Sequence, residues 1–201
     1  MDSRLNQWER VTPSAVSKLL HRFSPGWWIA GGWAIVLHLG RHIRDHGDID
    51  VLLQRSDQVA IQAYLAGWDL YVADPPGRLR QWLPGEHLHR PTQDIWCRPE
   101  PESRWHIQIM LIDVEDGDWV FKRDPRIRRQ LSEIGLENSE GIPYLRPEIQ
   151  LLYKAKSPRP KDEIDFTAVL PMLTDGERSW LRSALSLAYG EHRWVAKLFQ
   201  R

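Results

Sequence analysis

Acidic and aliphatic residues alternate from Asp48 to Leu53, and this pattern constrains the fold more than any other stretch of the chain. A period of two predicts a β-strand with successive side chains on opposite faces. Asp48 and Asp50 then point to one face, while Ile49 points into the core. Two neighbouring carboxylates repel each other, and a divalent cation between them removes that cost. Because hard carboxylate oxygens suit magnesium, we interpret Asp48 and Asp50 as ligands of Mg²⁺.

A pair of glycines and two arginines precede this strand. The acid-x-acid motif alone is also explained by an exposed strand edge, so its neighbours matter. Gly31-Gly32 separates an apolar strand, Trp27 to Ala30, from a short helix expected at Trp33 to Leu39. Glycines there let backbone N–H groups approach a phosphate, although a tight strand-to-helix turn also needs them. Arg41 and Arg44 supply cations for a triphosphate. Phosphate cradle, cations and metal ligands thus follow one another in one strand–helix–strand unit.

Strands dominate the middle of the chain and helices the end, which predicts an α+β fold. We expect a mixed sheet of about five strands with helices on one face and the acidic strand in its interior. Pro147 sits at a helix start, and helical periodicity continues from there. The sequence therefore predicts a core domain of residues 1–142 and a helical C-terminal subdomain of residues 143–201. A long segment from Asp74 to Pro91, rich in proline, glycine and charge, is expected to be a loop.

The composition excludes several classes of protein. Lys plus Arg equals Asp plus Glu, at 27 each, so the chain has no basic excess for general nucleic-acid binding. The run of arginines from Arg123 to Arg129 is interpreted as charged surface because acids lie nearby. The lone Cys97 excludes an internal disulfide, and no apolar run approaches the length of a membrane span. We expect a cytoplasmic protein with no membrane partner.

The segment before and through the acidic strand resembles the polymerase-β-like nucleotidyltransferase superfamily. Within it, the likeness is to aminoglycoside 2″-adenylyltransferase-type proteins. The resemblance is specific over residues 27 to 53, is looser to about residue 122, and includes a helical part from Pro147 to Phe166. The residues that carry it are Trp28 to Ile35, Leu39-Gly40-Arg41, Arg44, His46 and Asp48-Ile49-Asp50.

This resemblance implies a nucleotidyltransferase-like mixed β-sheet with flanking helices and a helical unit after it. It implies that Gly31 and Gly32 contact nucleotide phosphates, that Arg44 lies near them, and that Asp48 and Asp50 hold Mg²⁺. It also implies ATP as co-substrate. A hydroxyl of a small molecule, aminoglycoside-like by family analogy, attacks the α-phosphorus, and pyrophosphate leaves.

The family also has a third carboxylate on a neighbouring strand, and this chain has Gln108 at that position. If strands 94–97 and 105–112 form a hairpin with its turn near residue 101, Asp94 lies opposite Gln108 and supplies the carboxylate. Asp94 equally fits a role as a strand cap after the long loop. The rival, Asp113, is an odd number of residues from Gln108 and so falls on the other face unless a bulge intervenes. A third possibility is that the third acid is absent.

Gln108 therefore keeps other functions open. One is a toxin–antitoxin-type enzyme that transfers AMP to a protein, and another is a non-catalytic nucleotide-binding module. A cationic antibiotic would favour an acidic cleft. A chain with a net charge of zero and eleven tryptophans gives no indication of such a cleft. Tryptophan packs cores or lines ligand clefts, and composition alone does not separate these uses.

Overall fold

The computed structural model describes residues 7–75 and 77–199, which form two compact units. Of these residues, the first unit contains 7–29 and 46–112, and the second contains 30–45 and 113–199. Residues 30–45 and 113–142 thus group with the C-terminal helices rather than with the acidic strand. The domain boundary at residue 142 stays a prediction, since a compact unit need not fold separately.

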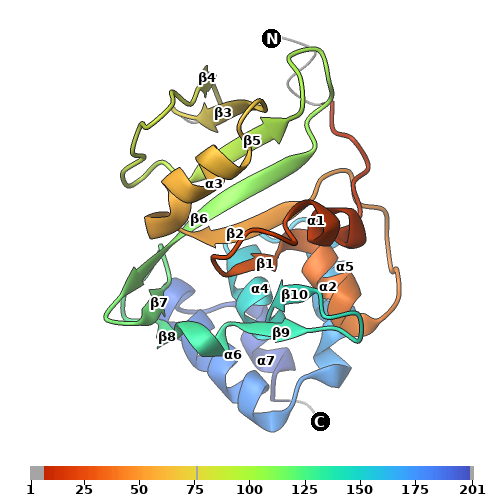
Figure 1. Ribbon diagram of the computed structural model, residues 1–201. Helices are drawn as coiled ribbons and strands as arrows, with labels where there is room; N and C mark the ends of the chain where they lie inside the picture. The colour runs from red at the N-terminus through yellow and green to blue at the C-terminus, as the bar shows by residue number, and fades with distance from the viewer. Residues whose placement is uncertain (1–6, 76, 200–201) are drawn as a thin grey trace. The chain divides into compact units, whose positions relative to one another are not determined.

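A mixed sheet forms the first unit (Figure 1). Its neighbouring strands, in order across the sheet, are β4 (Leu79–Gln81), β3 (Asp69–Ala73), β5 (Asp94–Arg98), β6 (Ile107–Glu115), β2 (Asp50–Gln54) and β1 (Trp27–Ile29). β2 and β6 are parallel, and the other neighbouring pairs are antiparallel. The acidic strand lies between β6 and β1, inside the sheet as predicted. β6 runs on into the second unit from Asp113.

One face of this sheet carries the apolar core of the first unit. Burial alternates along β3, β5 and β6, and the buried positions are Leu70, Val72, Ile95, Cys97, Ile107, Ile109 and Leu111. α3 (Gln58–Tyr64) lies in front of β5 and β6 in Figure 1 and buries Ile61. Side chains at the alternate positions project from the opposite face.

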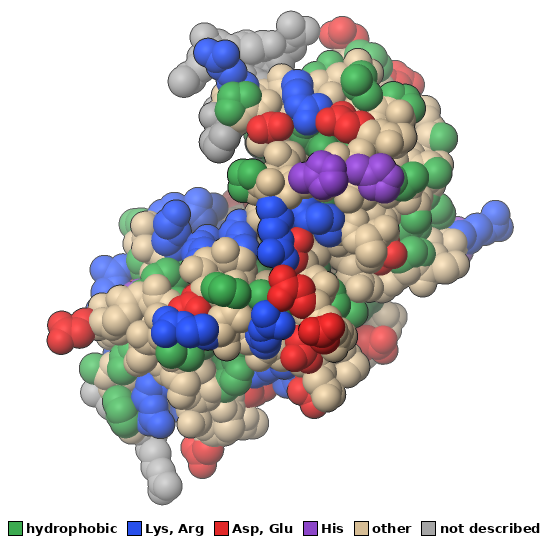
Figure 2. All heavy atoms as spheres, turned by 90° about the vertical axis from the view of Figure 1, so that its left-hand side faces the viewer, with side chains coloured by type: hydrophobic (Ala, Val, Ile, Leu, Met, Phe, Trp, Pro, Cys, Tyr) green, Lys and Arg blue, Asp and Glu red, His purple; other side chains and the backbone are tan. Residues whose placement is uncertain are grey.

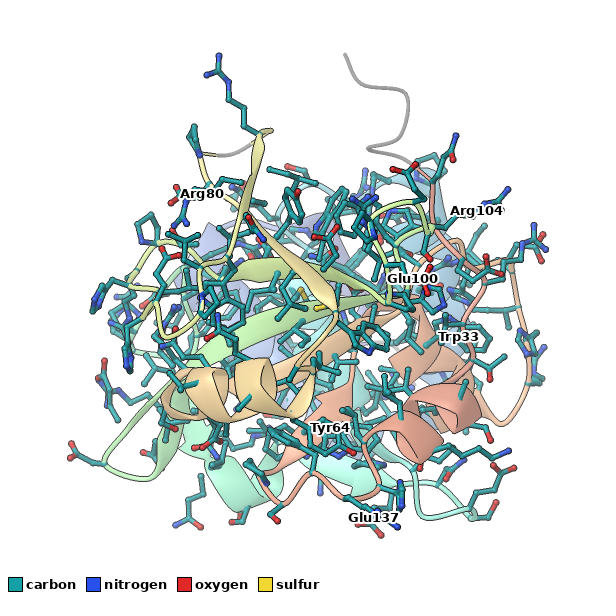
Figure 3. All side chains as sticks on the ribbon, turned by 45° about the horizontal axis from the view of Figure 1, so that its top comes forward. Trp33, Tyr64, Arg80, Glu100, Arg104 and Glu137 are labelled. Carbon is teal, nitrogen blue, oxygen red and sulfur yellow. The ribbon has the colours of Figure 1, made fainter. Side chains whose placement is uncertain are left out.

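Helix α1 (Pro13–Leu19) begins with Thr12 as N-cap and proline in the first turn, a combination typical of helix starts. The Oγ1 of Thr12 accepts a hydrogen bond from the N–H of Ala15 at 3.3 Å. The hydroxyl of Tyr64, at the end of α3, donates to the carbonyl of Leu19 at 2.7 Å. Figure 3 shows Tyr64 between the two helices, so this one side chain ties α1 to α3.

Two local predictions in the first unit are corrected. The acidic strand begins at Asp50 instead of Asp48, and a 3-10 turn at Arg55–Asp57 follows it before α3. The expected loop from Asp74 to Pro91 contains β4, which pairs with β3 after a turn where Gly77 has a φ of 84°. The charged, proline-rich sequence of this segment did not predict a strand there.

The second unit combines short strands with most of the helices. Its strands are β7 (Asp118–Val120), β8 (Arg128–Gln130), β9 (Gly135–Glu137) and β10 (Pro143–Leu145). Its helices are α2 (Gly31–Leu39), α4 (Pro147–Lys154), α5 (Pro160–Val169), α6 (Asp175–Tyr189) and α7 (Arg193–Lys197), with 3-10 turns at Leu131–Glu133 and Leu170–Met172. β7 pairs with β6 and β8, and β9 pairs with β10. The helices from Pro147 onward were predicted from the sequence, whereas the short strands β8, β9 and β10 were not.

The helices of the second unit pack around large apolar side chains. Phe166 and Trp194 are both fully buried, and their rings stack with centroids 4.3 Å apart. Thr174 and Glu177 form a capping box at the start of α6, which fixes where this helix begins. In the described part of the chain, no helix has the length and hydropathy needed to cross a membrane.

The core of the first unit gives a stability prediction. Ile95 is 0% exposed, so Ile95→Ala removes buried contacts and leaves a cavity. We expect the free energy of unfolding to fall by about 2–5 kcal/mol in urea titrations. Leu83, which is 57% exposed, is the control, and Leu83→Ala should change it by no more than about 0.5 kcal/mol. Equal effects of the two changes would contradict this assignment of the core face.

Candidate active site

A row of side chains crosses the noncore face of the first unit's sheet. Asp50 pairs with Gln108 across β2 and β6, Gln108 pairs with Trp96 across β6 and β5, and Trp96 pairs with Tyr71 across β5 and β3. Directly paired residues project to the same face. The sheet therefore places a carboxylate, an amide and two aromatic rings in one line.

Asp48 and Asp50 flank a residue that is fixed in the core. Ile49 is 0% exposed, and its carbonyl oxygen accepts a hydrogen bond from the backbone N–H of Gln108 at 3.0 Å. β-pairing therefore already holds the chain one residue before β2 begins. Asp48 is exposed and Asp50 half-buried. Two hard carboxylates on either side of a buried anchor suit Mg²⁺, which keeps open coordination positions for phosphate oxygens.

The register of β5 against β6 corrects the predicted position of Asp94. Asp94 lies opposite Met110, not opposite Gln108, because the connection between the strands is centred further along the chain than expected. The shift is two residues, so Asp94 keeps the expected face of the sheet. It lies diagonally from Gln108, whose Nε2 donates to the Oδ1 of Asp94 at 3.2 Å. The Nε2 of Gln93 also donates to this oxygen, at 3.3 Å.

Asp94 does not complete a three-carboxylate cluster. Across residues 7–75 and 77–199, no three His, Cys, Asp or Glu side chains are grouped so that they could hold a metal ion. Asp94 instead accepts a hydrogen bond from Gln108, and Gln108 pairs with Asp50 on the next strand. The rival acid, Asp113, lies where β6 pairs with Val120 of β7 in the second unit.

The glycine pair lies at the start of α2 in the second unit. Gly31 has a φ of 64°, and its N–H donates to the Oε1 of Gln150 at 2.7 Å. Gln150 is 5% exposed on α4, and the sequence analysis did not identify its role. A polar residue among the apolar Ile149, Leu151 and Leu152 was the available signal. The contact of Gly31 and Gly32 with phosphate stays a prediction. Because the N–H of Gly31 already donates to Gln150, a phosphate bound at Gly31 has to share this N–H with the Gln150 side chain.

Arg44 forms a buried ion-pair network within the second unit. Its Nε and Nη2 donate to Oδ1 and Oδ2 of Asp165 at 2.7 and 2.8 Å, and Asp165 is 0% exposed. The Nζ of Lys154 lies 2.9 Å from Asp165 and 3.1 Å from Asp162. Arg44 therefore ties the segment before the acidic strand to α5. Its place near nucleotide phosphates stays a prediction.

The pKa values of both aspartates follow from these contacts. Burial alone raises the pKa of Asp165, but hydrogen bonding from Arg44 and the charge of Lys154 outweigh it and lower that pKa. Burial also acts to raise the pKa of Asp162, yet hydrogen bonds from Arg159 and the charge of Lys154 lower it to about 2. Both carboxylates are therefore ionised at neutral pH, which balances the two buried cations.

Arginines of the run from Arg123 to Arg129 have acidic partners. Arg126 lies 2.6 Å from Asp124, and Arg128 lies 2.8 Å from Glu115. Figure 2 shows Lys and Arg side chains interspersed with Asp and Glu on the face drawn. These pairs fit the interpretation of this run as ordinary charged surface.

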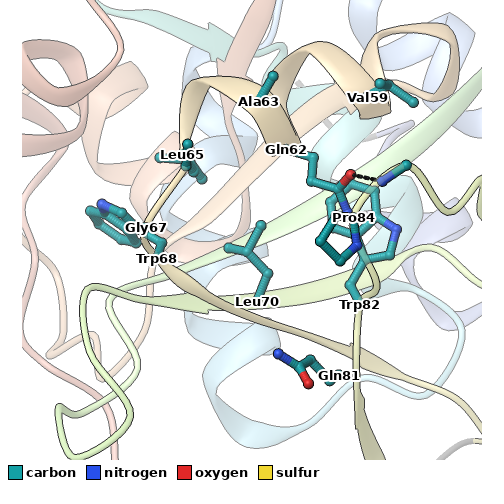
Figure 4. Close-up of a pocket in the computed structure, with 12 residues that line it drawn as sticks. Val59, Gln62, Ala63, Leu65, Gly67, Trp68, Leu70, Gln81, Trp82 and Pro84 are labelled. Carbon is teal, nitrogen blue, oxygen red and sulfur yellow. Dashed lines mark hydrogen bonds between the residues drawn. The ribbon is translucent and has the colours of Figure 1, made fainter.

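A cavity of about 450 Å³ lies on the α3 side of the first unit's sheet (Figure 4). Its lining includes Leu65, Trp68, Leu70 and Trp82. The N–H of Gly85 donates to Gln62 at its rim, at 2.7 Å. Leu70 points to the core face, opposite Tyr71, so this cavity is separate from the row that contains Asp50.

Comparison with known sequences supports the resemblance seen in the chain. The profile of the family described as aminoglycoside-2″-adenylyltransferase matches residues 14–73. This region includes the glycine pair and the acidic strand. Among curated proteins, no sequence match to the chain was found.

Three solved structures are similar to the whole fold. Lincosamide antibiotic adenylyltransferase LnuA, with lincomycin bound, has a TM-score of 0.55 at 18% identity, covering 84% of this chain and 100% of its own. The antibiotic-resistance factor ANT(2″)-Ia in solution has a TM-score of 0.54 at 18% identity, covering 85% and 86%. ANT(2″)-Ia in complex with adenylyl-2″-tobramycin has a TM-score of 0.50 at 17% identity, covering 87% and 97%. The α+β, nucleotidyltransferase-like fold expected from the sequence is confirmed.

The ion-pair network predicts a pH dependence of stability. The folded pKa of Asp162 is about 2, below its ordinary 3.8, so ionised Asp162 stabilises the fold above pH 4. This contribution, about 2 kcal/mol, is lost as the pH falls through 2. Urea unfolding between pH 5 and pH 2 should show a smaller loss for Asp162→Asn than for the wild type. The exposed Glu140→Gln should behave as wild type, and an undiminished loss in the Asp162 variant would refute the assignment.

Proposed function

We propose that this protein is a cytoplasmic Mg²⁺-dependent adenylyltransferase that transfers AMP from ATP to a hydroxyl of a small molecule. The observation that carries the proposal is the pairing of Asp50 with Gln108, whose side chain also donates to Asp94 of the next strand, β5, on the same face of the sheet. The profile match over this strand supports it. So does the likeness to antibiotic adenylyltransferases, which motivates a hydroxyl-bearing acceptor such as a glycoside. The lone buried cysteine, Cys97, fits a reducing compartment.

Asp48 and Asp50 would hold the metal. When bound, Mg²⁺ neutralises charge on the triphosphate and makes the α-phosphorus more electrophilic. The protein contributes position: β-pairing through Ile49 and Gln108 fixes the backbone that carries both carboxylates. Fixed charges in a defined place lower the barrier without rearrangement during the reaction.

Asp94 is the proposed general base. Its Oδ1 accepts hydrogen bonds from two amides, Gln93 and Gln108, which orient the carboxylate. Its Oδ2 remains to accept the proton of the acceptor hydroxyl. The hydroxyl oxygen then bonds to the α-phosphorus, and the bond from that phosphorus to the bridging oxygen breaks. Pyrophosphate leaves with the electron pair, and the acceptor carries AMP.

A second candidate function is nucleotide binding without turnover. It is favoured by the lack, among the described residues, of a three-carboxylate group around Asp48 and Asp50. The two candidates differ in one measurement, because only the enzyme releases pyrophosphate from ATP when an acceptor is present. Release measured with Mg²⁺, ATP and a panel of glycosides decides between them.

Removing either metal carboxylate should abolish this activity. We expect Asp48→Asn and Asp50→Asn each to lose Mg²⁺-dependent pyrophosphate release. Without metal, each should keep or raise the melting temperature, because one of two repelling charges is gone. Glu100→Gln, in the exposed connection between β5 and β6 (Figure 3), is a matched control and should keep full activity. Full activity in either aspartate variant would show that the metal binds elsewhere.

The base assignment gives a separate prediction. Asp94→Asn keeps the shape and the face of the sheet but cannot take the proton, so kcat should fall about 10²–10⁴-fold with little change in the KM for ATP. Gln108→Ala removes only the orienting hydrogen bond and should lower kcat less. A loss in Gln108→Ala as large as in Asp94→Asn, or an unchanged kcat in Asp94→Asn, would rule out Asp94 as the base.

A further inference from the structure

Four aromatic side chains gather on the same sheet face as Asp50 and Asp94. Trp96 contacts Trp8 edge-to-face, with centroids 4.9 Å apart, and contacts Trp105 at 5.5 Å. Tyr71 contacts Trp105 at 5.6 Å. The segment that carries Trp8 is held by its own pairing, since the N–H of Glu9 donates to the carbonyl of Trp105 at 2.8 Å. We call Trp8, Tyr71, Trp96 and Trp105 the aromatic platform.

The core of the first unit does not account for the aromatic platform. The core lies on the other face, where Ile95, Cys97, Ile107 and Ile109 are at most 1% exposed. On the platform Trp105 is 4% exposed, but Trp8, Tyr71 and Trp96 are only half-buried. Partly exposed aromatic rings grouped together are typical of a surface that binds a ligand.

The platform is continuous with the proposed catalytic residues. Trp96 is directly opposite Gln108, which is directly opposite Asp50. Neighbouring strands lie about 4.8 Å apart, so Trp96 is about 10 Å from the metal carboxylate along the row. Asp94 precedes Trp96 by two residues on β5, on the same face and about 7 Å away. A ring packed on Trp96 can therefore present a hydroxyl to Asp94.

The charges on this face limit the charge of the acceptor. The Nε of Arg98 lies 2.7 Å from Asp69, and the guanidinium covers the ring of Trp105 at 4.4 Å. Asp69 is thus neutralised within the protein, and Asp48 and Asp50 are assigned to Mg²⁺. Of the acidic residues that the described strands of this unit carry, Asp94 is then the one left to meet a cation.

We propose that the aromatic platform binds the acceptor, and that this acceptor is a hydroxyl-bearing ring compound with a nonpolar face and at most one positive charge. The inference rests on the proposed function and names its substrate class. Trp96 packs on the nonpolar face of the ring and determines specificity. Polyamines are disfavoured because one carboxylate cannot pair with several ammonium groups.

The test measures acceptor binding by calorimetry with Mg²⁺ and a non-hydrolysable ATP analogue. Lincomycin is the monoamine glycoside probe and tobramycin the polyamine probe. Wild-type protein should bind lincomycin at least tenfold more tightly than tobramycin at 0.15 M salt. Trp96→Leu should weaken lincomycin binding about tenfold and leave analogue binding unchanged.

Trp68→Leu is the matched control, because Trp68 is a half-buried tryptophan of the same unit that lines the cavity beside α3. It should leave lincomycin binding unchanged. Tighter binding of tobramycin, no binding of either glycoside, or equal losses in both tryptophan variants would overturn the proposal. Because binding is measured without turnover, an inactive protein that still binds lincomycin through Trp96 supports the platform while refuting the transferase.

Discussion

The parallel pairing of β2 with β6 is the constraint on which the proposed site depends. It sets Asp50 beside Gln108, and the antiparallel pairing of β6 with β5 then brings Asp94 and Trp96 onto the same face. A slip of one residue would send the acidic residues to the core face and Ile49 to solvent. The full burial of Ile49 opposes that slip, so the hydrophobic core fixes the geometry of the carboxylates.

A second constraint operates in the segment that leads to the acidic strand. Arg44 and Lys154 share the fully buried Asp165, so removal of this carboxylate leaves excess buried positive charge. Gln150 likewise receives the N–H of Gly31, at the start of α2. Residues that the motif alone assigns to nucleotide are thus also joined to α4 and α5. Part of the motif serves the internal structure of the second unit.

The sequence allowed much of this fold to be predicted, and the failures have physical causes. The alternation that begins at Asp48 located β2, the strands expected at 94–97 and 105–112 match β5 and β6, and Pro147 marked the start of α4. β4, β8 and β9 are short and polar, so their pairing depends on neighbours rather than on their own pattern. The face of Asp94 was predictable from parity, but its partner was not, because the length of the connection to β6 sets the register. Gln150 was missed because its partner, the N–H of Gly31, is distant in sequence.

The central claim is that Asp48 and Asp50 hold the catalytic metal. Anomalous diffraction from crystals grown with Mn²⁺ in place of Mg²⁺ and a non-hydrolysable ATP analogue tests it most directly. The account predicts a manganese peak coordinated by carboxylate oxygens of both aspartates and by phosphate oxygens of the nucleotide. A nucleotide bound with its metal away from these two carboxylates would contradict it.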